Sequence, residues 1–319
     1  MSVAGSSTLR RLAPFAGLAL VILVFAVLTG APEQYLSIPN LRIVLAQTVI
    51  VAIGAVGMTM IIVSGGIDLS VGSTIALTSV ATALTIDRSG SPAFAIALAI
   101  LLGAAVGAVN GLVITTLRVV PFIATLGMLG AARGVAKWAA GEMTVAAPET
   151  WINELAVTFP SQAWIVVAPG VWITIVLAVA ASLALQRTVF GRHVFAIGSN
   201  EVAARACGIA VTRMKVAIYA LAGSAFGLAG VMQMSRLRQG DPTVAAGAEL
   251  DIIAAVVIGG GGLSGGEGGI FGALIGGPIM AVFRNGCQQV GWPNYIQEII
   301  IGAIIVIAVA LESRARARN

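Results

Sequence analysis

The segment VIVAIGAVGMTMIIVSGGIDLSVGS, residues 49–73, joins a long, almost entirely apolar run to a stretch of glycine and serine that carries one carboxylate, Asp68. An ionised carboxylate at the centre of a bilayer costs roughly 2.5–3.5 kcal/mol on insertion scales. At about 1.5 Å per residue, a helix that begins at Leu41 crosses the hydrocarbon by Val63. Asp68 is therefore expected close to a membrane face rather than at the bilayer centre.

Two interpretations of this break are open. In the first, Gly65 and Gly66 end one helix, and Asp68 or Ser70 caps the next. In the second, the same break is also a hinge or gate, because glycine permits backbone rearrangement. A similar break, GGGGLSGGEGG at 259–269, contains Gly262 and Ser264, and it is expected at the same membrane face.

Composition identifies the chain as an integral membrane protein. Hydrophobic residues make up 58%, charged residues 10%, and the mean hydropathy is +1.01, whereas soluble domains carry about 25% charged residues. The apolar runs are continuous and near twenty residues long, which predicts helices rather than a β-barrel. The net charge of +5 comes from basic residues between these runs and at the C-terminus, as orientation signals do, so nucleic acid is not an expected partner.

The predicted fold is all-α, one polytopic membrane domain over residues 1–319 with about ten transmembrane helices, some short or broken. The predicted spans are 12–31, 41–63, 70–86, 93–117, 121–140, 163–186, 214–235, 250–264, 268–284 and 295–312. Eleven Lys and Arg residues fall in one set of connecting segments and five in the other, which predicts that both termini are cytoplasmic. The external loop is then 141–162 and the longest cytoplasmic loop is 187–215.

The residues needed for enzymatic chemistry are missing from the sequence. Neither lysine, Lys137 nor Lys215, lies in a G-x-x-x-x-G-K-[ST] phosphate-binding loop. The single histidine, His193, has no HExxH context, and Cys207 and Cys287 form no CxxC pair. We therefore expect no catalytic residues, no metal site and no cofactor in this chain, and infer that it moves a solute across the membrane.

The stretch SNEVAARACGIAV, residues 199–211, predicts a short amphipathic helix on the cytoplasmic side. Ser199 or Asn200 can cap its start, Glu201 and Arg205 form a favourable i, i+4 pair, and Gly208 is expected to end it. One interpretation is a helix that rests on lipid headgroups. Its small residues favour the other, docking into a groove of a partner protein, because lipid anchoring prefers large apolar side chains.

This stretch resembles the EAA loop of ABC importer permeases, with Glu201, Ala203, Ala204 and Gly208 at its acidic, alanine and glycine positions and Val202 inserted. Segments 57–73, 121–128, 198–209 and 249–266 resemble, in the same order, the monosaccharide (ribose, xylose, galactose) permeases of binding-protein-dependent ABC importers. Glu267 departs from the basic residue expected after LSGG, which leaves the role of this position open.

The resemblance implies a permease subunit that accepts a monosaccharide or small polyol from a periplasmic or extracellular binding protein and passes it across the bacterial inner membrane. It further implies a cytoplasmic ATP-binding subunit that uses ATP and Mg²⁺, a second permease copy or paralogue, and a ten-helix core similar to that of the cobalamin importer. Coupling to the ATPase would involve Glu201, Ala203, Ala204, Arg205 and Gly208.

A sugar pathway needs scattered polar groups, and Gln47, Asn110 and Thr125 are candidates to line it, although hydrogen bonds between helices are the alternative role for each. The main rival function is an ion-coupled secondary transporter with Asp68 as its proton or sodium site. A passive channel is a second rival. Neither rival gives the loop at 199–211 a task.

Overall fold

The computed structural model of the chain describes residues 3–158 and 167–316. In these residues the regular structure is helical, apart from one pair of two-residue strands, and one of the helices is a 3-10 turn. The long helices are α1 (Val3–Leu28), α3 (Ile38–Val63), α4 (Val71–Ser89), α5 (Pro92–Thr116), α6 (Pro121–Ala139), α7 (Pro169–Arg187), α10 (Val211–Leu237), α12 (Ile270–Val290) and α13 (Asn294–Arg316). The short elements are α2 (Pro32–Tyr35), η1 (Trp151–Glu154), α8 (Val189–Ser199), α9 (Glu201–Ala206), α11 (Ala248–Ile258), and the antiparallel strands β1 (Val145–Ala146) and β2 (Gln239–Gly240).

Each of the ten predicted apolar segments contains one helix. By length and composition, five helices in the described part of the chain are suited to cross a membrane: α3, α5, α7, α10 and α12. Pro14–Leu28 and Asn294–Ile307 are shorter apolar helical stretches. The chain is thus an all-α polytopic membrane protein, and the count of ten spans stays a prediction. Part of the sixth predicted span, residues 163–166, lies outside the described residues.

Two boundaries differ from the prediction for local reasons. The helix α11 ends at Ile258 instead of 264, because the four glycines that follow it turn the chain, and Gly260 has a φ of +89°. The helix α12 continues to Val290 instead of ending at 284, so Arg284 lies well inside the helix and not at its end. Arg236 likewise lies inside α10, one residue before its end.

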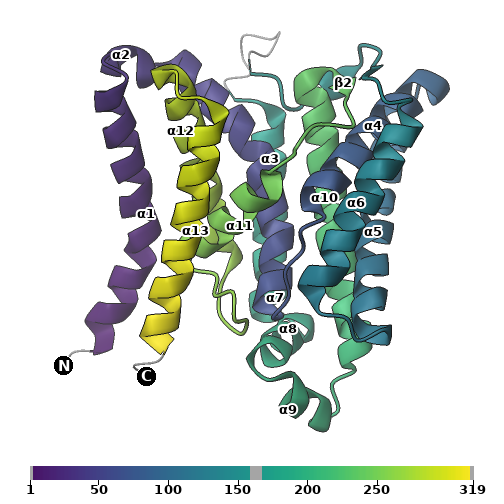
Figure 1. The fold of residues 1–319 in the computed structure, drawn as a ribbon, viewed down its shortest axis with the longest axis vertical. Coiled ribbons are helices and arrows are strands. Elements are labelled where there is room, and N and C mark those ends of the chain that lie inside the picture. Colours follow the sequence, from purple (N-terminus) through teal and green to yellow (C-terminus); the bar gives the residue numbers. More distant parts are fainter. Residues whose placement is uncertain (1–2, 159–166, 317–319) are drawn as a thin grey trace.

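Helix α3 is the centre of the fold, with 89% of its most apolar window buried, compared with 22% for α5 and α7. It packs against α10, α12, α11 and α7. In Figure 1, α1, α12 and α13 lie to one side of α3, and α4, α5 and α6 lie to the other. Apolar residues on every face of α3 therefore face protein, whereas large faces of α5 and α7 are available to lipid or to another chain.

Both ends of the chain lie at the same end of the bundle as α8 and α9, while α2 and β2 lie at the opposite end (Figure 1). We call these the α9 end and the β2 end. This arrangement agrees with the expectation that the loop at 187–215 and both termini share one side of the membrane. Which side is cytoplasmic rests on the distribution of positive charge.

Glycines spaced four residues apart in α5 and in α12 lie at close helix contacts. A Cβ atom on Gly103 would lie 2.8 Å from the backbone nitrogen of Gly227, and one on Gly111 would lie 2.7 Å from the Cα of Val216. Helices α5 and α10 therefore meet backbone to backbone, which only small residues allow. Gly276 makes a similar approach to the backbone of α11.

Candidate coupling and gating site

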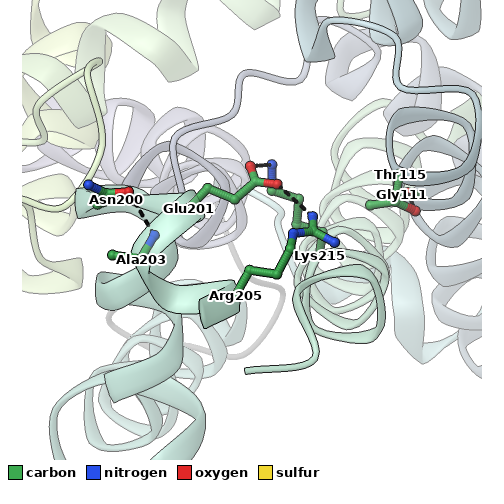
Figure 2. A network of polar contacts seen from close by, with 7 residues as sticks. All are labelled: Gly111, Thr115, Asn200, Glu201, Ala203, Arg205 and Lys215. Carbon is green, nitrogen blue, oxygen red and sulfur yellow. Dashed lines mark hydrogen bonds and ion pairs between the residues drawn. The ribbon is translucent and has the colours of Figure 1, made fainter. Parts of the chain in front are cut away.

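The short helix α9 begins and ends where its sequence predicted. Asn200 is the N-cap, and its side-chain oxygen accepts a hydrogen bond of 2.9 Å from the backbone nitrogen of Ala203 (Figure 2). Gly208 has a φ of +85°, a left-handed conformation that glycine adopts without strain. The result is a helix of six residues at the α9 end, joined to α8 by a single residue.

An ion-pair network fixes α9 against α10. The carboxylate of Glu201 lies 2.6 Å from Nζ of Lys215, which is in α10, and 3.1 Å from the guanidinium of Arg205 (Figure 2). Burial raises the pKa of Glu201, but the hydrogen bonds and positive charges of Lys215 and Arg205 outweigh burial and lower the pKa below its ordinary value. Glu201 is therefore ionised at neutral pH, and it links the two helices.

The two faces of α9 have different environments. Ala204 is 5% exposed and packs with Ile197 and Val211 of the same chain, whereas Val202 is 79% exposed and Ala203 is also exposed. Ala204 thus fits α9 onto its own protein, and the surface free for a partner is the face with Val202 and Ala203. The role of these residues in coupling stays a prediction.

The break at Gly65 and Gly66 ends α3 as the sequence predicted. Gly65 has a φ of +80°, its nitrogen donates to the carbonyl of Ile62 (2.9 Å), and the nitrogen of Gly66 donates to the carbonyl of Ile61 (3.0 Å). This is a helix end of the Schellman type, which requires a left-handed residue.

Ser70 is the N-cap residue of α4, but neither its side chain nor that of Asp68 caps the first turn of the helix; the two side chains bond each other instead. Asp68 Oδ1 accepts hydrogen bonds from the backbone nitrogen (2.7 Å) and the hydroxyl (2.6 Å) of Ser70. Asn110 of α5 donates to Asp68 Oδ2 (3.2 Å) and to the Ser70 hydroxyl (3.0 Å). Asp68, Ser70 and Asn110 are each at most 1% exposed. The carboxylate is thus held by neutral donors from two helices.

Two of the three residues proposed to line the path contact this same loop. Besides Asn110, the buried hydroxyl of Thr125 in α6 accepts a hydrogen bond from the backbone nitrogen of Leu69 (3.2 Å) and donates to the carbonyl of Pro121 (2.9 Å). Asn110 and Thr125 thus hydrogen-bond another segment of the chain, which is the role that the sequence offered as the alternative to contact with the substrate. Gln47 lies apart from them, beside a cavity described below. A role in substrate passage stays a prediction for all three.

The two glycine-rich breaks lie side by side, and they meet the end of α8. The nitrogen of Gly266 donates a hydrogen bond of 2.9 Å to the carbonyl of Val63. A Cβ on Gly265 would lie 2.8 Å from both the carbonyl oxygen of Gly198 and the Cα of Gly65. We call residues 63–66, 198–199 and 265–266 the glycine junction.

The glycine junction adjoins the predicted coupling helix, because Ser199 and the start of α9 are separated only by Asn200. Gly262 shapes the turn that presents Gly265, whose nitrogen donates to the Gly262 carbonyl at 3.0 Å, and Ser264 is exposed beside it. The sequence predicts both breaks at one membrane face, but not that Gly198 joins them.

A polar cavity that the sequence did not predict lies in the other half of the fold. Its lining includes Gln47, Gln233, Arg236, Asp251 and Arg284, and its volume is about 240 Å³. Asp251 and Arg284 form a two-point ion pair, with distances of 2.6 and 3.0 Å. Two opposite charges in separate apolar helices are a signal that could have predicted this pair.

Comparison with known proteins adds a family and named relatives. A family described as the permease component of branched-chain amino acid transport systems matches residues 40–309. The ribose import permease of Escherichia coli K12 is 40% identical over 93% of this chain and 92% of its own. The corresponding Bacillus subtilis protein is 40% identical over 97% and 94%, and the fructose import permease of Rhizobium meliloti is 33% identical over 95% and 85%. No solved structure gives a significant match.

Proposed function

The chain belongs to the family of permease components of branched-chain amino acid transport systems, and we propose that it is the membrane subunit of an ATP-driven importer of a monosaccharide or similar small polyol. As a permease component it is a transport protein and not an enzyme. The relatives named for ribose and fructose import favour a sugar over an amino acid as the solute.

The observation that carries the proposal is the position of α9. This helix is exposed at the end of the bundle that holds both termini, and its N-terminal neighbour Gly198 packs directly on the two glycine breaks that end α3 and precede α12. A partner that moves α9 therefore acts on the backbone at both breaks. A secondary transporter or a passive channel has no use for such a connection.

The proposed assembly contains a cytoplasmic ATP-binding subunit that contacts α9 and supplies the ATP and Mg²⁺ chemistry. It also contains a periplasmic or extracellular sugar-binding protein and a second permease, either the same chain or a paralogue. In this assembly the chain is a single ten-span domain with a core like that of the cobalamin importer, in the bacterial inner membrane, with both termini cytoplasmic. The exposed faces of α5 and α7 leave room for the second permease.

The rival with Asp68 as an ion-coupling site is less well supported by its surroundings. Both Asp68 oxygens accept hydrogen bonds from neutral partners, Ser70 and Asn110. The other buried carboxylate of the apolar helices, Asp251, is paired with Arg284. Asp251 is thus held by a fixed cation, and Asp68 is enclosed by hydrogen bonds from its own loop and from α5, so neither is an unpartnered acidic group.

Uptake of radiolabelled sugar into vesicles tests the proposal. The permease is reconstituted with its ATP-binding subunit and loaded binding protein, and ribose, arabinose and fructose are compared. We expect uptake that requires ATP on the side of the vesicle membrane where the ATP-binding subunit lies. This uptake should continue in the presence of a protonophore. Uptake that persists without the ATP-binding subunit and stops with the protonophore would identify an ion-coupled transporter instead.

A further inference from the structure

The polar cavity lies between four helices in the half of the bundle nearer the β2 end. Gln47 comes from α3, Gln233 and Arg236 from the last turns of α10, Asp251 from α11, and Arg284 from α12. Helices α10 and α12 both end at the β2 end (Figure 1). Its volume of about 240 Å³ is far larger than one water molecule needs.

Three polar groups in the cavity wall have no hydrogen-bond partner among the described residues. The Gln233 side chain is 6% exposed and lines the cavity, and it makes no hydrogen bond within the described part of the chain. The side-chain oxygen of Gln47 and the Nε of Arg236 are buried and also lack a protein partner. The Gln47 oxygen and the Arg236 Nε are thus desolvated without a protein partner, which costs free energy. The Gln233 amide lines the cavity and is available to hydrogen-bond a solute in it.

The ion pair of Asp251 and Arg284 adds donors and acceptors to the same wall. Asp251 is 4% exposed, and each of its oxygens accepts one hydrogen bond from Arg284. A carboxylate has about four acceptor positions and a guanidinium has five donors, so both groups keep unused capacity. Because the charges neutralise each other, this part of the wall suits hydroxyl groups better than a free ion.

The N-terminus of α11 also contributes to the cavity. Ala245, Ala246 and Ala248 line it, and Gly247, with a φ of +81°, precedes the helix without a side-chain cap. In this first turn the backbone nitrogen of Ala248 donates to the carbonyl of Ala245 (3.2 Å), and that of Leu250 donates to the carbonyl of Gly247 (3.1 Å). The helix start therefore shapes the cavity wall, while the hydrogen-bonding groups of the cavity come from side chains.

We propose that this cavity is a polyol subsite of the translocation path, in which Gln47 and Gln233 hydrogen-bond sugar hydroxyls while Asp251 and Arg284 bind neighbouring hydroxyls. This inference rests on the proposed function and deepens it, since it assigns substrate contact to particular residues. A neutral sugar fits better than an anion. Most polar groups of the cavity wall are neutral amides or belong to the neutralised ion pair, and Arg236 is the one lining guanidinium without a carboxylate partner among the lining residues.

The test compares maximal transport rates in the complete reconstituted importer, at saturating loaded binding protein, so that affinity of the binding protein does not determine the result. The probes are the sugar that the wild-type importer transports and those of its monodeoxy analogues that the binding protein accepts. The variants are Gln233→Ala, Gln47→Ala and the more conservative Gln233→Asn. The matched control is Gln297→Ala, which removes another buried amide, in α13, that bonds the carbonyl of Trp292.

We expect Gln233→Ala to lower the rate for the intact sugar about 3- to 10-fold, the effect of one hydrogen bond. For the deoxy analogue that lacks the hydroxyl bound by Gln233, the variant and the wild type should transport at the same rate. The ratio of the two rates should therefore fall, and Gln297→Ala should leave it as in the wild type. A purely structural role lowers both rates together, so an unchanged ratio in all cavity variants overturns the subsite.

Two further outcomes are informative. Faster transport of a sugar phosphate than of the sugar would overturn the assignment to a neutral polyol. A wild-type importer that takes up no sugar with ATP would refute the proposed function, and this result is distinguishable because it is seen before any variant is made. If Gln233→Ala does not assemble, Gln47→Ala and Gln233→Asn give the same ratio test.

Discussion

Alanine in place of Gly198 is the sharpest perturbation of the glycine junction. Gly198 lies in the last turn of α8, where alanine is favoured over glycine by up to about 1 kcal/mol through helix propensity. Its Cβ would, however, overlap the carbonyl oxygen of Val63 and lie 2.6 Å from the backbone nitrogen of Gly266. These two atoms form the hydrogen bond that joins the breaks, and backbone atoms cannot rotate aside as a side chain can.

The magnitude follows from this overlap. Adding a methyl group to a close-packed site costs about 1–3 kcal/mol, and here the cost falls on the contact between α8 and the two breaks. Gly134→Ala in α6 is the matched control, because a Cβ there meets nothing within 4 Å. It keeps the gain in helix propensity without the overlap. A cost of this size changes an equilibrium constant about 5- to 150-fold. The two variants should therefore differ by this factor in the equilibrium between a junction in which α8 contacts both breaks and one in which it does not.

The assay is the number of sugar molecules transported per ATP hydrolysed in proteoliposomes that contain the complete importer. We expect Gly198→Ala to hydrolyse ATP but to transport fewer sugar molecules per ATP, because α9 can still bind the ATPase while its movement no longer reaches the breaks. Gly134→Ala should behave as the wild type does. A Gly198→Ala transporter with wild-type coupling would refute the mechanical role of the junction, provided that copurification confirms assembly.

Three further predictions concern neighbouring contacts. Alanine at both Gly65 and Gly66 should impair uptake while the complex still copurifies, because a left-handed alanine costs roughly 1–2 kcal/mol; normal uptake would exclude a hinge here. Since the pKa of Glu201 is lowered, its stabilisation of α9 should be complete above about pH 4.5 and be lost as the pH falls through the lowered pKa. Hydrogen exchange of α9 should follow this curve, and Glu201→Gln should abolish it. Asn110→Leu leaves Asp68 Oδ2 without its donor and should lower the unfolding temperature, at a cost of about 1–3 kcal/mol.

The helices could be predicted from the sequence because their signals are local. Length and hydropathy place the ten apolar segments, and Gly65 and Gly208 end helices by their left-handed backbone wherever the rest of the chain lies. The ridge of Gly103 and Gly107 predicts a close neighbour, although it does not say that the neighbour is α10. These features depend on a few consecutive residues and on the bilayer.

The glycine junction and the polar cavity could not be predicted because both arise from contacts between distant segments. Gly198 has no side chain, so no periodic pattern indicates that it meets Val63 and Gly266. The predicted span ends at residue 284 because hydropathy falls at polar residues such as Asn285, whereas the helix continues to Val290 because its face toward α11 and α3 is buried. Tertiary packing set the helix end there, and the hydropathy of the segment alone did not.

The two sites missed by sequence analysis are connected by one short helix. Helix α11 starts at Ala248 beside the cavity, places Asp251 in its wall, and ends at Ile258, where the chain enters the glycines that reach the junction. Its eleven residues correspond to about 16 Å. A rigid displacement of α11 at the junction therefore also moves Asp251 relative to Arg284 on α12. This geometry explains why a perturbation at Gly198 should lower the sugar transported per ATP without any contact between Gly198 and the solute.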